Sequence, residues 1–329
     1  MIKKALICGI SGQDGAYLSR FLLRKGYEVH GTARDAQMAT FSNLNALGIR
    51  ERITCHSMAL NDFRSVLQVL STVQSYEIYN LAGQSSVGLS FEQPVETLES
   101  ISVGTLNLLE AIRFLKCPVR LYNAGSSECF GNTGGEPADE NTPFRPRSPY
   151  AVAKATAFWE IANYREAYGL YASTGILFNH ESPLRPDRFV TQKIVRSACR
   201  IADGSRQKLK LGNIGIARDW GWAPEYVEAM WMILQQEHAD DFVIATGQTN
   251  SLEAFVAEVF RCVGLDWREH VETDKALLRP SEIMVSRANP GKSAQKLGWQ
   301  ATYKMKDVAR MMVEESRSRI TAKAQHKAM

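Results

Sequence analysis

The sequence has few of the features that mark membrane, exported or metal-binding proteins. No apolar run in its 329 residues approaches the ~20 residues of a membrane span. The first ten residues, MIKKALICGI, place two lysines before an apolar stretch, but Gly9, Gly12 and Gly15 interrupt it and no cleavage site follows. We therefore expect no signal peptide, no membrane partner and a location in the cytoplasm.

The cysteines of the sequence follow no spacing that is typical of a metal site. The six of them, at positions 8, 55, 117, 129, 199 and 262, show neither C-x-x-C nor any other metal-ligand spacing. We expect free thiols in a reducing compartment and no metal site. Cys129 beside Glu128 could act as a nucleophile, but no histidine lies near it in the sequence, and its neighbours indicate a different chemistry.

An excess of charge of one sign is also missing. The formal net charge of +4 is too small to predict a nucleic-acid partner, and the apolar fraction of 45% is that of an ordinary globular protein. Part of the positive charge lies in residues 316–329, SRSRITAKAQHKAM, which contain no acid. This segment is expected to be a basic tail.

What is present is a regular alternation of strand and helix signals over the first half of the chain. Strands are expected over 3–10, 28–33, 77–83, 119–127 and 171–178, and helices over 14–27, 65–74, 101–116 and 148–169. Ser148 and Pro149 suit the N-cap and first turn of the last helix. This order predicts a Rossmann-like, doubly wound α/β fold whose parallel sheet is covered by helices on both faces.

The alternation ends after Phe178. We expect a loop over 179–189, helices over 193–204, 225–236, 252–264 and 305–319, and strands over 208–213 and 241–247. The pattern predicts a dinucleotide-binding domain of residues 1–178, rejoined by about 223–247. A smaller, interwoven C-terminal substrate domain would then comprise residues 179–222 and 248–315.

The stretch GISGQDG places Gly9, Gly12 and Gly15 between the first strand and the first helix. Glycines at such a turn let the backbone approach a pyrophosphate, which the helix N-terminus attracts. The end of the second strand, which reads the adenosine ribose, offers both Arg34 and Asp35. Because an arginine suits the 2′-phosphate of NADP and an acid suits the free hydroxyls of NAD, the residues leave the choice of cofactor open.

A possible catalytic group lies in AGSSECFG and SPYAVAK. Tyr150 and Lys154 are four residues apart, on one face of the predicted helix, and Ser126 ends a preceding strand. An ammonium near a phenol favours phenolate and lowers its pKa from about 10. Tyr150 could then take a proton from a substrate hydroxyl that loses a hydride to nicotinamide, while Ser126 bonds the same oxygen.

More specific motifs carry a resemblance to a known family. GISGQDGAYL, EIYNLAGQSSV, SSECFG, SPYAVAK, GILFNHESPLR, RDWG and YVEAMW resemble extended short-chain dehydrogenase/reductases and, more narrowly, the GDP-mannose 4,6-dehydratases, from Lys4 to about Glu315. By position, the resemblance implies that Ser126, Glu128, Tyr150 and Lys154 form the catalytic group.

The resemblance also implies a reaction in which Glu128 acts as a general base and acid. Oxidation at C4 of GDP-mannose makes the C5 proton acidic, Glu128 removes it and then protonates the departing 6-hydroxyl, and the hydride returns to C6. The product is GDP-4-keto-6-deoxymannose, and the cofactor is regenerated.

Further contacts follow from the same match. The implied cofactor-binding residues are Gly9, Gly12, Gln13, Asp14, Gly15, Arg34, Leu81, Gln84, Tyr150, Lys154 and His180. The implied GDP-sugar-binding residues are Ser85, Glu128, Asn179, Lys193, Arg218, Arg279 and Glu282. Arginines suit the GDP diphosphate because their planar fork makes bidentate charged contacts.

The sequence departs from the family pattern at three places. Asp35 stands where a second arginine is usual, so we expect NADP with NAD as an alternative. Ala59 replaces an aspartate that meets the adenine. Gly83 and Ser86 leave more room beside the sugar, so another GDP-hexose or heptose could replace GDP-mannose.

Two rival functions stay open. A nucleotide-sugar 4-epimerase or 4-reductase would keep the fold and the Tyr150 chemistry but would need no base for elimination, so Glu128 separates it from a dehydratase. A catalytically silent dinucleotide-binding protein is the other. The resemblance also implies a homodimer or homotetramer, since the apolar helices over 101–116 and 148–169 could form a four-helix contact between copies.

Overall fold

The computed structural model describes residues 2–328, and within it the side chains up to residue 318. Its centre is one seven-stranded sheet in which every neighbouring pair of strands is parallel. From one edge to the other the strands are β10 (Phe242–Ile244), β6 (Ala172–Leu177), β5 (Arg120–Ser126), β4 (Glu77–Asn80), β1 (Lys4–Cys8), β2 (Glu28–Ala33) and β3 (Thr54–Ser57). The order 3-2-1-4-5-6 with β10 added confirms the predicted Rossmann-like fold.

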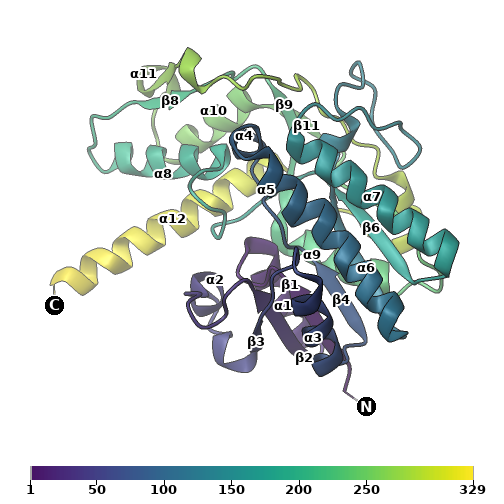
Figure 1. Cartoon of the computed structure of the whole chain (residues 1–329). Helices are drawn as coiled ribbons and strands as arrows, with labels where there is room; N and C mark the ends of the chain where they lie inside the picture. The colour runs from purple at the N-terminus through teal and green to yellow at the C-terminus, as the bar shows by residue number, and fades with distance from the viewer. Residues whose placement is uncertain (1, 329) are drawn as a thin grey trace.

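Helices cover both faces of this sheet (Figure 1). On one face lie α1 (Gln13–Arg24) and α9 (Ala223–Leu234), and on the other lie α3 (Phe63–Val73), α6 (Gly104–Leu115) and α7 (Pro149–Tyr168). β1 shows why both faces must be covered: Ala5 and Ile7 join one core cluster, while Leu6 and Cys8 join the other. All four are fully buried, as expected for a strand in the middle of a parallel sheet.

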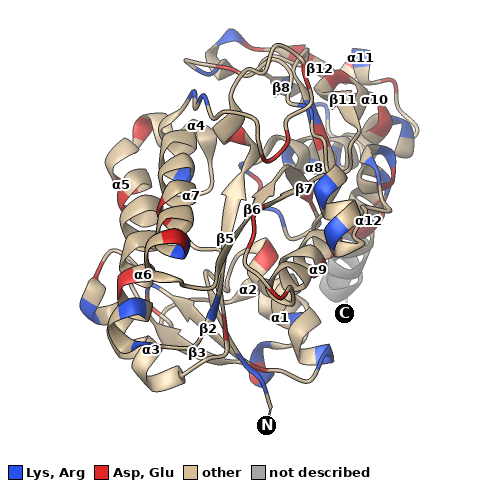
Figure 2. Ribbon diagram, turned by 90° about the vertical axis from the view of Figure 1, so that its right-hand side faces the viewer, with Lys and Arg blue, Asp and Glu red and all other residues tan. Residues whose placement is uncertain are grey.

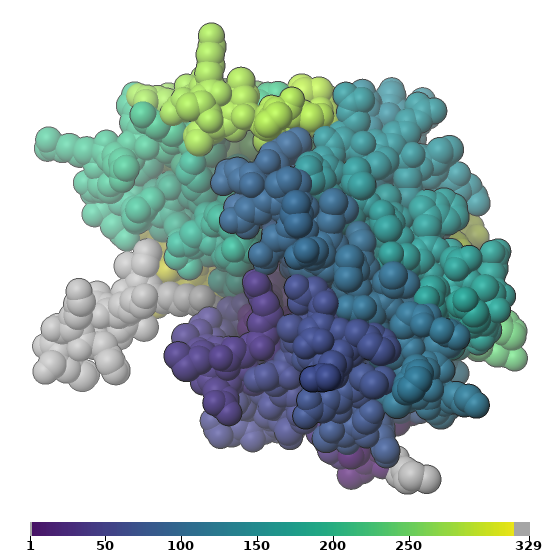
Figure 3. All heavy atoms as spheres, in the orientation of Figure 1, coloured from purple at the N-terminus to yellow at the C-terminus, as the bar shows by residue number. Residues whose placement is uncertain are grey.

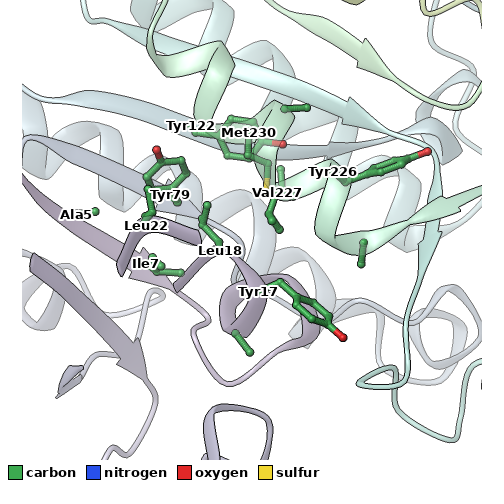
Figure 4. Close-up of a cluster of buried hydrophobic side chains, with 14 of the residues drawn as sticks. Ala5, Ile7, Tyr17, Leu18, Leu22, Tyr79, Tyr122, Tyr226, Val227 and Met230 are labelled. Atoms are coloured by element: carbon green, nitrogen blue, oxygen red, sulfur yellow. The ribbon is translucent and has the colours of Figure 1, made fainter. Parts of the chain in front are cut away.

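The core on the α1 side is completed by the second half of the chain. Figure 4 shows Leu18 and Leu22 of α1 near Ile7 of β1 and near Val227 and Met230 of α9. Each of these side chains is buried, and burial of an aliphatic side chain stabilises a fold by roughly 1.5–3 kcal/mol. The prediction that residues 225–236 return to the sheet is confirmed by these contacts.

The remaining strands build the outer part of the molecule. β7 (Asn179–Glu181), β9 (Ala217–Trp222) and β11 (Thr249–Ser251) form a three-stranded sheet, and β8 (Leu209–Leu211) pairs with β12 (Val271–Thr273). Their core is packed by α8 (Val190–Ala202), α10 (Leu252–Cys262) and α12 (Met305–Ala328) around Trp220 and Phe255. In Figure 3 the N-terminal segments occupy one end of the visible face and the yellow-green C-terminal segments the other, with residues near 90–110 between them.

Short elements connect these layers. They are α2 (Ser42–Ala46), α4 (Val87–Glu92), α5 (Pro94–Leu98) and α11 (Trp267–His270), the 3-10 turns η1 (Arg50–Arg52), η3 (Ser127–Phe130) and η4 (Lys275–Leu277), and the π-helical turns η2 (Glu99–Val103) and η5 (Ser293–Leu297). Among the described residues, no helix combines the length and apolarity that crossing a membrane requires. The six cysteines are free, and Cys8, Cys129 and Cys199 are buried.

The expected loop over 179–189 is wrong in its first part. Asn179–Glu181 form β7, which pairs in parallel with β9. The strands β3 and β9 were not expected at all, because TCHS and ARDWGW lack a run of apolar residues. The predicted helix over 305–319 instead continues as α12 to Ala328.

Candidate active site

Two adjoining hollows lie at the carboxyl ends of the central strands. The first, here the glycine-turn hollow, has a volume of about 510 Å³ and is lined by Gly9, Gly12 and Gly15. The second, here the Tyr150 hollow, has a volume of about 340 Å³ and lies between Tyr150 and the outer sheet. Both volumes are in the range of small-molecule sites. The residues that line both hollows are Asp14, Leu81, Ser85, Arg185, Arg188 and Phe189.

The glycine turn is tightly built where it packs and open where it lines the hollow. Gly9 has φ +81°, and a Cβ there would lie 2.9 Å from the backbone of Ala82. A Cβ on Gly15 would lie 2.6 Å from the Gly9 carbonyl oxygen. Gly12 is different: it is the N-cap of α1, and its added Cβ would meet only the Gly9 carbonyl, at 3.4 Å. The backbone N–H groups at the start of α1 can therefore approach a phosphate closely.

Two side chains after this turn reach β7. The Gln13 amide donates to the His180 carbonyl at 3.2 Å, and Ser182 donates to Gln13 Oε1 at 2.7 Å. Asp14 Oδ2 accepts from His180 Nε2 at 2.9 Å. Burial would raise the pKa of Asp14, but the charge and hydrogen bond of His180 outweigh it and hold that pKa at about 2. These bonds join the two parts of the molecule at the site.

The ring of His180 is fixed on both sides. Its Nδ1 bonds the Phe178 carbonyl oxygen at 2.8 Å, and its ring stacks on Tyr226 with centroids 4.6 Å apart. Burial would lower the pKa of His180, yet the Asp14 carboxylate raises it above its ordinary value. With acceptors on both ring nitrogens, the histidine is held as a cation below that raised pKa.

The side chains of Arg34 and Asp35 have different surroundings. Arg34 lines the glycine-turn hollow, where its guanidinium bonds the Glu96 carboxylate at 3.1 Å. Asp35 does not line the hollow; its carboxylate accepts from the backbone N–H groups of Gln37 and Met38, at 2.9 and 3.1 Å. The acid thus stabilises its own turn, and the arginine is the member of the pair that lines the hollow.

The segment after β4 forms the floor between the hollows. Leu81, Gln84 and Ser85 all line the glycine-turn hollow. The Gln84 amide donates to the Ser86 carbonyl at 2.8 Å and to Thr97 Oγ1 at 3.2 Å, which fixes the turn. Gly83 has φ +115°, a conformation that favours glycine, so the backbone conformation explains why a glycine stands at this position.

The predicted catalytic residues gather at the ends of β5 and α7. Ser126 is the last residue of β5, and the Tyr150 hydroxyl hydrogen-bonds its side chain. Ser148 caps α7 by accepting from the Ala151 N–H at 3.1 Å, which confirms the predicted helix start and sets Tyr150 in the first turn. Lys154, one turn later, is buried and donates to the Ala124 carbonyl at 2.7 Å.

The expectation that Lys154 lowers the pKa of Tyr150 is wrong in this structure. Burial raises the pKa of Tyr150 above its ordinary value, and the hydrogen bond with Ser126 only partly offsets it. The Lys154 ammonium lies 6.0 Å from the Tyr150 ring centre and is committed to a carbonyl. Burial lowers the pKa of Lys154 itself to about 8. Helical spacing places the two side chains on one face but cannot say where their polar ends point.

Glu128 lies in η3 and lines the Tyr150 hollow. Within the described part of the chain, its carboxylate accepts no hydrogen bond, although its backbone N–H donates to Ser126 Oγ at 3.3 Å. Burial raises its pKa, and Arg218 and Arg279 limit the rise by their charge. A half-buried carboxylate with a raised pKa and open oxygens can both accept and return a proton.

Charged side chains form the outer wall of the same hollow. Arg218 is buried and bonds the Ile283 carbonyl at 2.7 Å and the Glu282 carboxylate at 3.1 Å. Arg279 reaches the same carboxylate at 3.4 Å. Lys193 donates to the Lys210 carbonyl at 2.7 Å. Asn179, at the start of β7, completes the wall.

Every sequence-predicted site residue therefore lines one of the two hollows. Arg185 and Arg188 were missed, although both line the two hollows at once. They lie in the irregular segment between β7 and α8, where no periodicity or motif could assign them a direction. Cys129 is buried and lines neither hollow, and burial raises its thiol pKa to about 12, so its setting does not suit a nucleophile.

Comparisons with known proteins agree with one another. A family model described as GDP-mannose 4,6 dehydratase matches residues 6–312. The chain is 46% identical over 323 residues to GDP-mannose 4,6 dehydratase 1 of Arabidopsis thaliana, covering 95% of this chain and 89% of the relative. It is 42% identical over 340 residues to the GDP-mannose 4,6-dehydratase of Sinorhizobium fredii, covering 96% and 97%.

Solved structures show the same architecture. The UDP-glucose 4-epimerase of Thermus thermophilus in complex with NAD superposes with a TM-score of 0.84 at 25% identity, covering 95% of this chain and 99% of that chain. The dTDP-glucose 4,6-dehydratase of Bacillus anthracis in complex with NAD gives 0.84 at 17% identity, covering 96% and 97%. At this identity the second match establishes the fold alone.

Proposed function

The chain belongs to the GDP-mannose 4,6-dehydratase family, and we propose that it converts GDP-mannose to GDP-4-keto-6-deoxymannose with a nicotinamide cofactor. The observation that favours a dehydratase over an epimerase or reductase is the environment of Glu128. Its carboxylate lies in the same hollow as Ser126, Tyr150 and Lys154, it has open oxygens, and burial raises its pKa.

The glycine-turn hollow fits the cofactor's diphosphate. Gly12 leaves the N-terminus of α1 accessible, since a Cβ at this position would meet no protein atom but the Gly9 carbonyl oxygen, at 3.4 Å. When bound, an oxidised nicotinamide supplies the hydride acceptor, the later hydride donor and one positive charge. Gln13, Asp14, Leu81, Gln84 and His180 are proposed to line it. Asp14 and His180 compensate each other's charge, so that the acid does not repel the phosphates.

Tyr150 is proposed to take the proton from the 4-hydroxyl of the sugar. Ser126 holds the same oxygen by a hydrogen bond, and Lys154 contributes a positive charge below its pKa of about 8. Because burial raises the pKa of Tyr150, its proton leaves only when a cation in the hollow compensates the phenolate. Loss of the 4-hydroxyl proton and a hydride makes C4 a ketone.

Glu128 is proposed to perform the elimination. The ketone makes the C5 proton acidic, and the Glu128 carboxylate removes it. The C6–O bond then breaks, and the protonated Glu128 gives that proton to the leaving hydroxyl, which departs as water. A proton returns to C5 after C6 is reduced, so the atoms of one water are lost and the redox state of the sugar nucleotide is unchanged overall.

Ser85, Asn179, Lys193, Arg218, Arg279 and Glu282 are proposed to hold the GDP-sugar. Arg218 and Arg279 share the Glu282 carboxylate, so a diphosphate can bind both guanidinium groups while Glu282 remains their common partner. In this division of labour, residues 1–178 with 223–247 mainly bind the cofactor, and residues 179–222 with 248–315 mainly bind the sugar nucleotide. Apart from the catalytic residues, Ser85 and His180 are the two contacts that each part contributes to the other's ligand.

One experiment tests the substrate and the reaction together. The purified protein, with NADP or NAD added, would be incubated separately with GDP-mannose, other GDP-hexoses and GDP-heptoses, and the products analysed by mass. Loss of one water from GDP-mannose supports the proposal. Loss from another GDP-sugar alone would reassign the substrate, and a mass unchanged with altered configuration at C4 would favour the epimerase.

NADP is the proposed cofactor, with NAD as the competitor in the test. Arg34 faces the hollow, while Asp35 is committed to its own turn. The free thiols suit a reducing compartment, and we propose the cytoplasm.

We also propose a homodimer or homotetramer. The helices α5, α6 and α7 lie side by side on one flank (Figure 2). The exposed large apolar side chains of this flank and of η2 are Val95, Leu98, Val103, Leu106, Phe114, Val152, Trp159 and Tyr168. Such a patch suits an isologous contact. A monomer by light scattering at micromolar concentration would contradict this.

A further inference from the structure

Tyr226, in the first turn of α9, is fully buried and lines neither hollow, but it contacts a residue of the site. Its ring stacks on the imidazole of His180, with ring centres 4.6 Å apart and an angle of 22° between the ring planes. The indole of Trp299 meets the Tyr226 ring edge-on, with centroids 5.7 Å apart. The Tyr226 ring is therefore in contact with rings from two distant parts of the chain.

The glycine at position 221 makes room for the Tyr226 ring. His180 of β7 and Gly221 of β9 are paired in register, so their side-chain positions are on the same face of this small sheet. A Cβ on Gly221 would lie 2.6 Å from the Tyr226 hydroxyl oxygen. Because Gly221 has no side chain, the Tyr226 ring can occupy the space next to His180. The stacking thus depends on residues of β7, β9 and α9 together.

The aromatic face of Tyr226, and not its hydroxyl group, is the part that acts on His180. The hydroxyl has no hydrogen-bond partner within the described residues. Burial raises the pKa of Tyr226 well above its ordinary value, and the negative charges of Asp219, Glu225 and Glu181 raise it further. The phenol is therefore neutral, and it offers His180 only its ring.

The orientation of the His180 ring matters because both of its nitrogens are bonded. Nδ1 bonds the Phe178 carbonyl oxygen at 2.8 Å, and Nε2 bonds the Asp14 carboxylate at 2.9 Å. Burial disfavours the imidazolium, Asp14 favours it, and the charge of Arg185 disfavours it. The Tyr226 ring adds to the effect of Asp14, because the face of an aromatic ring attracts a cation within about 6 Å of its centre.

We propose that Tyr226 is a positioning residue, whose aromatic face holds the imidazolium of His180 against Asp14. The consequence for binding rests on the nicotinamide-cofactor part of the proposed function. Asp14 lies in the first turn of α1, beside the glycine turn, and the imidazolium compensates its charge there. Without the Tyr226 ring, His180 is charged in a smaller fraction of molecules, and the Asp14 carboxylate then repels the cofactor's diphosphate.

Titration of the histidines by NMR tests the contact in the protein without cofactor. The chain contains six histidines, and the signal that is missing from His180→Gln identifies His180. Tyr226→Leu keeps an apolar side chain but lacks the aromatic face, so the midpoint of the His180 titration should fall by about 0.5–1 pH unit. Tyr226→Phe keeps the ring and should retain the parent midpoint. An unchanged or higher midpoint in Tyr226→Leu would overturn the inference, and so would an equal fall in Tyr226→Phe.

Two further variants separate positioning from a general loss of stability. Gly221→Ala should displace the Tyr226 ring and lower the His180 midpoint, as Tyr226→Leu does. Ile233→Ala, the control, removes a fully buried side chain two turns further along α9. It should lower the unfolding temperature and leave the His180 midpoint unchanged. A fall in Ile233→Ala as large as that in Tyr226→Leu would show that Tyr226 has a structural role only.

Calorimetry with NADP measures the consequence for the cofactor. At a pH above both midpoints, a fall of about 0.5–1 unit makes the charged form of His180 about threefold to tenfold rarer, so Tyr226→Leu should bind NADP more weakly by up to that factor. A lowered midpoint with unchanged NADP affinity would overturn the step from Asp14 to the cofactor. If the parent protein binds neither NADP nor NAD, the proposed function fails, while the His180 titration still decides whether Tyr226 positions that ring.

Discussion

Glutamates lie at opposite ends of two neighbouring central strands, one buried and the other half-buried, and their surroundings differ in the hydrogen bonds that they offer. Glu77, at the amino end of β4, is fully buried and accepts hydrogen bonds from Tyr27 at 3.0 Å, Tyr79 at 2.7 Å and Gln235 at 3.1 Å. Glu128, beyond the carboxyl end of β5, accepts none within the described residues, and Arg218 and Arg279 act on it through their charge alone.

This difference indicates that the Glu77 carboxylate stabilises the fold, whereas the Glu128 carboxylate is available for chemistry. Three donors compensate the burial of Glu77, so replacing the carboxylate by an amide would leave a buried tyrosine hydroxyl without its acceptor. Glu128 has no such bonds to lose, and burial raises its pKa. The same substitution at the two positions should therefore have opposite consequences.

The largest expected effect is on turnover. Glu128→Gln keeps the size of the side chain but removes the base, so dehydration should slow by roughly 10²–10⁴. Tyr150 and Lys154 remain, so C4 oxidation can still occur. Reduced cofactor and a 4-keto hexose that keeps its 6-hydroxyl should accumulate, measured by absorbance and mass.

Tyr150→Phe is the control for that prediction. It should block C4 oxidation itself, so neither the reduced cofactor nor the keto sugar should appear. Exchange of solvent deuterium at C5 should be present in the parent and absent in both variants. If Glu128→Gln dehydrates at the parent rate, Glu128 is an ordinary loop carboxylate and the epimerase or reductase becomes the better assignment.

The next effect is on stability. Glu77→Gln should lower the free energy of unfolding by about 2–3 kcal/mol, because Tyr27 and Tyr79 bond different carboxylate oxygens and the one that becomes NH₂ can no longer accept from its tyrosine. Denaturant titration measures this, with kcat for GDP-mannose expected to stay near that of the parent. A variant that loses turnover without losing stability would contradict the assignment of Glu77 to the fold.

A smaller effect concerns the cofactor. Arg34→Ala should weaken NADP(H) binding by about tenfold while NAD(H) binding changes little, since only NADP carries the 2′-phosphate. Calorimetry of both cofactors measures the ratio. The exposed pair with Glu96 contributes little to stability, so the unfolding temperature should not change. Equal or tighter NAD(H) binding by the parent would show that Arg34 does not select the cofactor.

The smallest effect is on the pH dependence of stability. The folded-state pKa of Glu128 is raised, so the carboxylate form destabilises the fold as the pH rises through that pKa. Glu128→Gln should therefore unfold at an equal or higher temperature than the parent at pH 7, and the difference should disappear near pH 4. A lower unfolding temperature at pH 7 would mean that the charged Glu128 stabilises the fold.

The sequence predicted those parts of the molecule that depend on local pattern. The strand at β1, the glycine turn and the start of α7 follow from apolar runs, turn chemistry and capping, which a sequence displays directly. The short strands β3, β7 and β9 form because neighbouring strands pair with them, and their own residues show little pattern. For the same reason the direction of the Lys154 ammonium and the place of Arg188 required coordinates.

The return of α9 and β10 to the central sheet has a consequence for how the protein is made. Val227 and Met230 cover α1 and β1, and β10 pairs with β6, so the first core lacks one covering helix and an edge strand until residue 244 has been synthesised. A nascent chain of residues 1–178 would expose the apolar face of α1 to solvent and to other chains. Truncation before α9 should therefore yield an aggregating fragment, and the ribosome must release the chain up to residue 244 before the central sheet is complete.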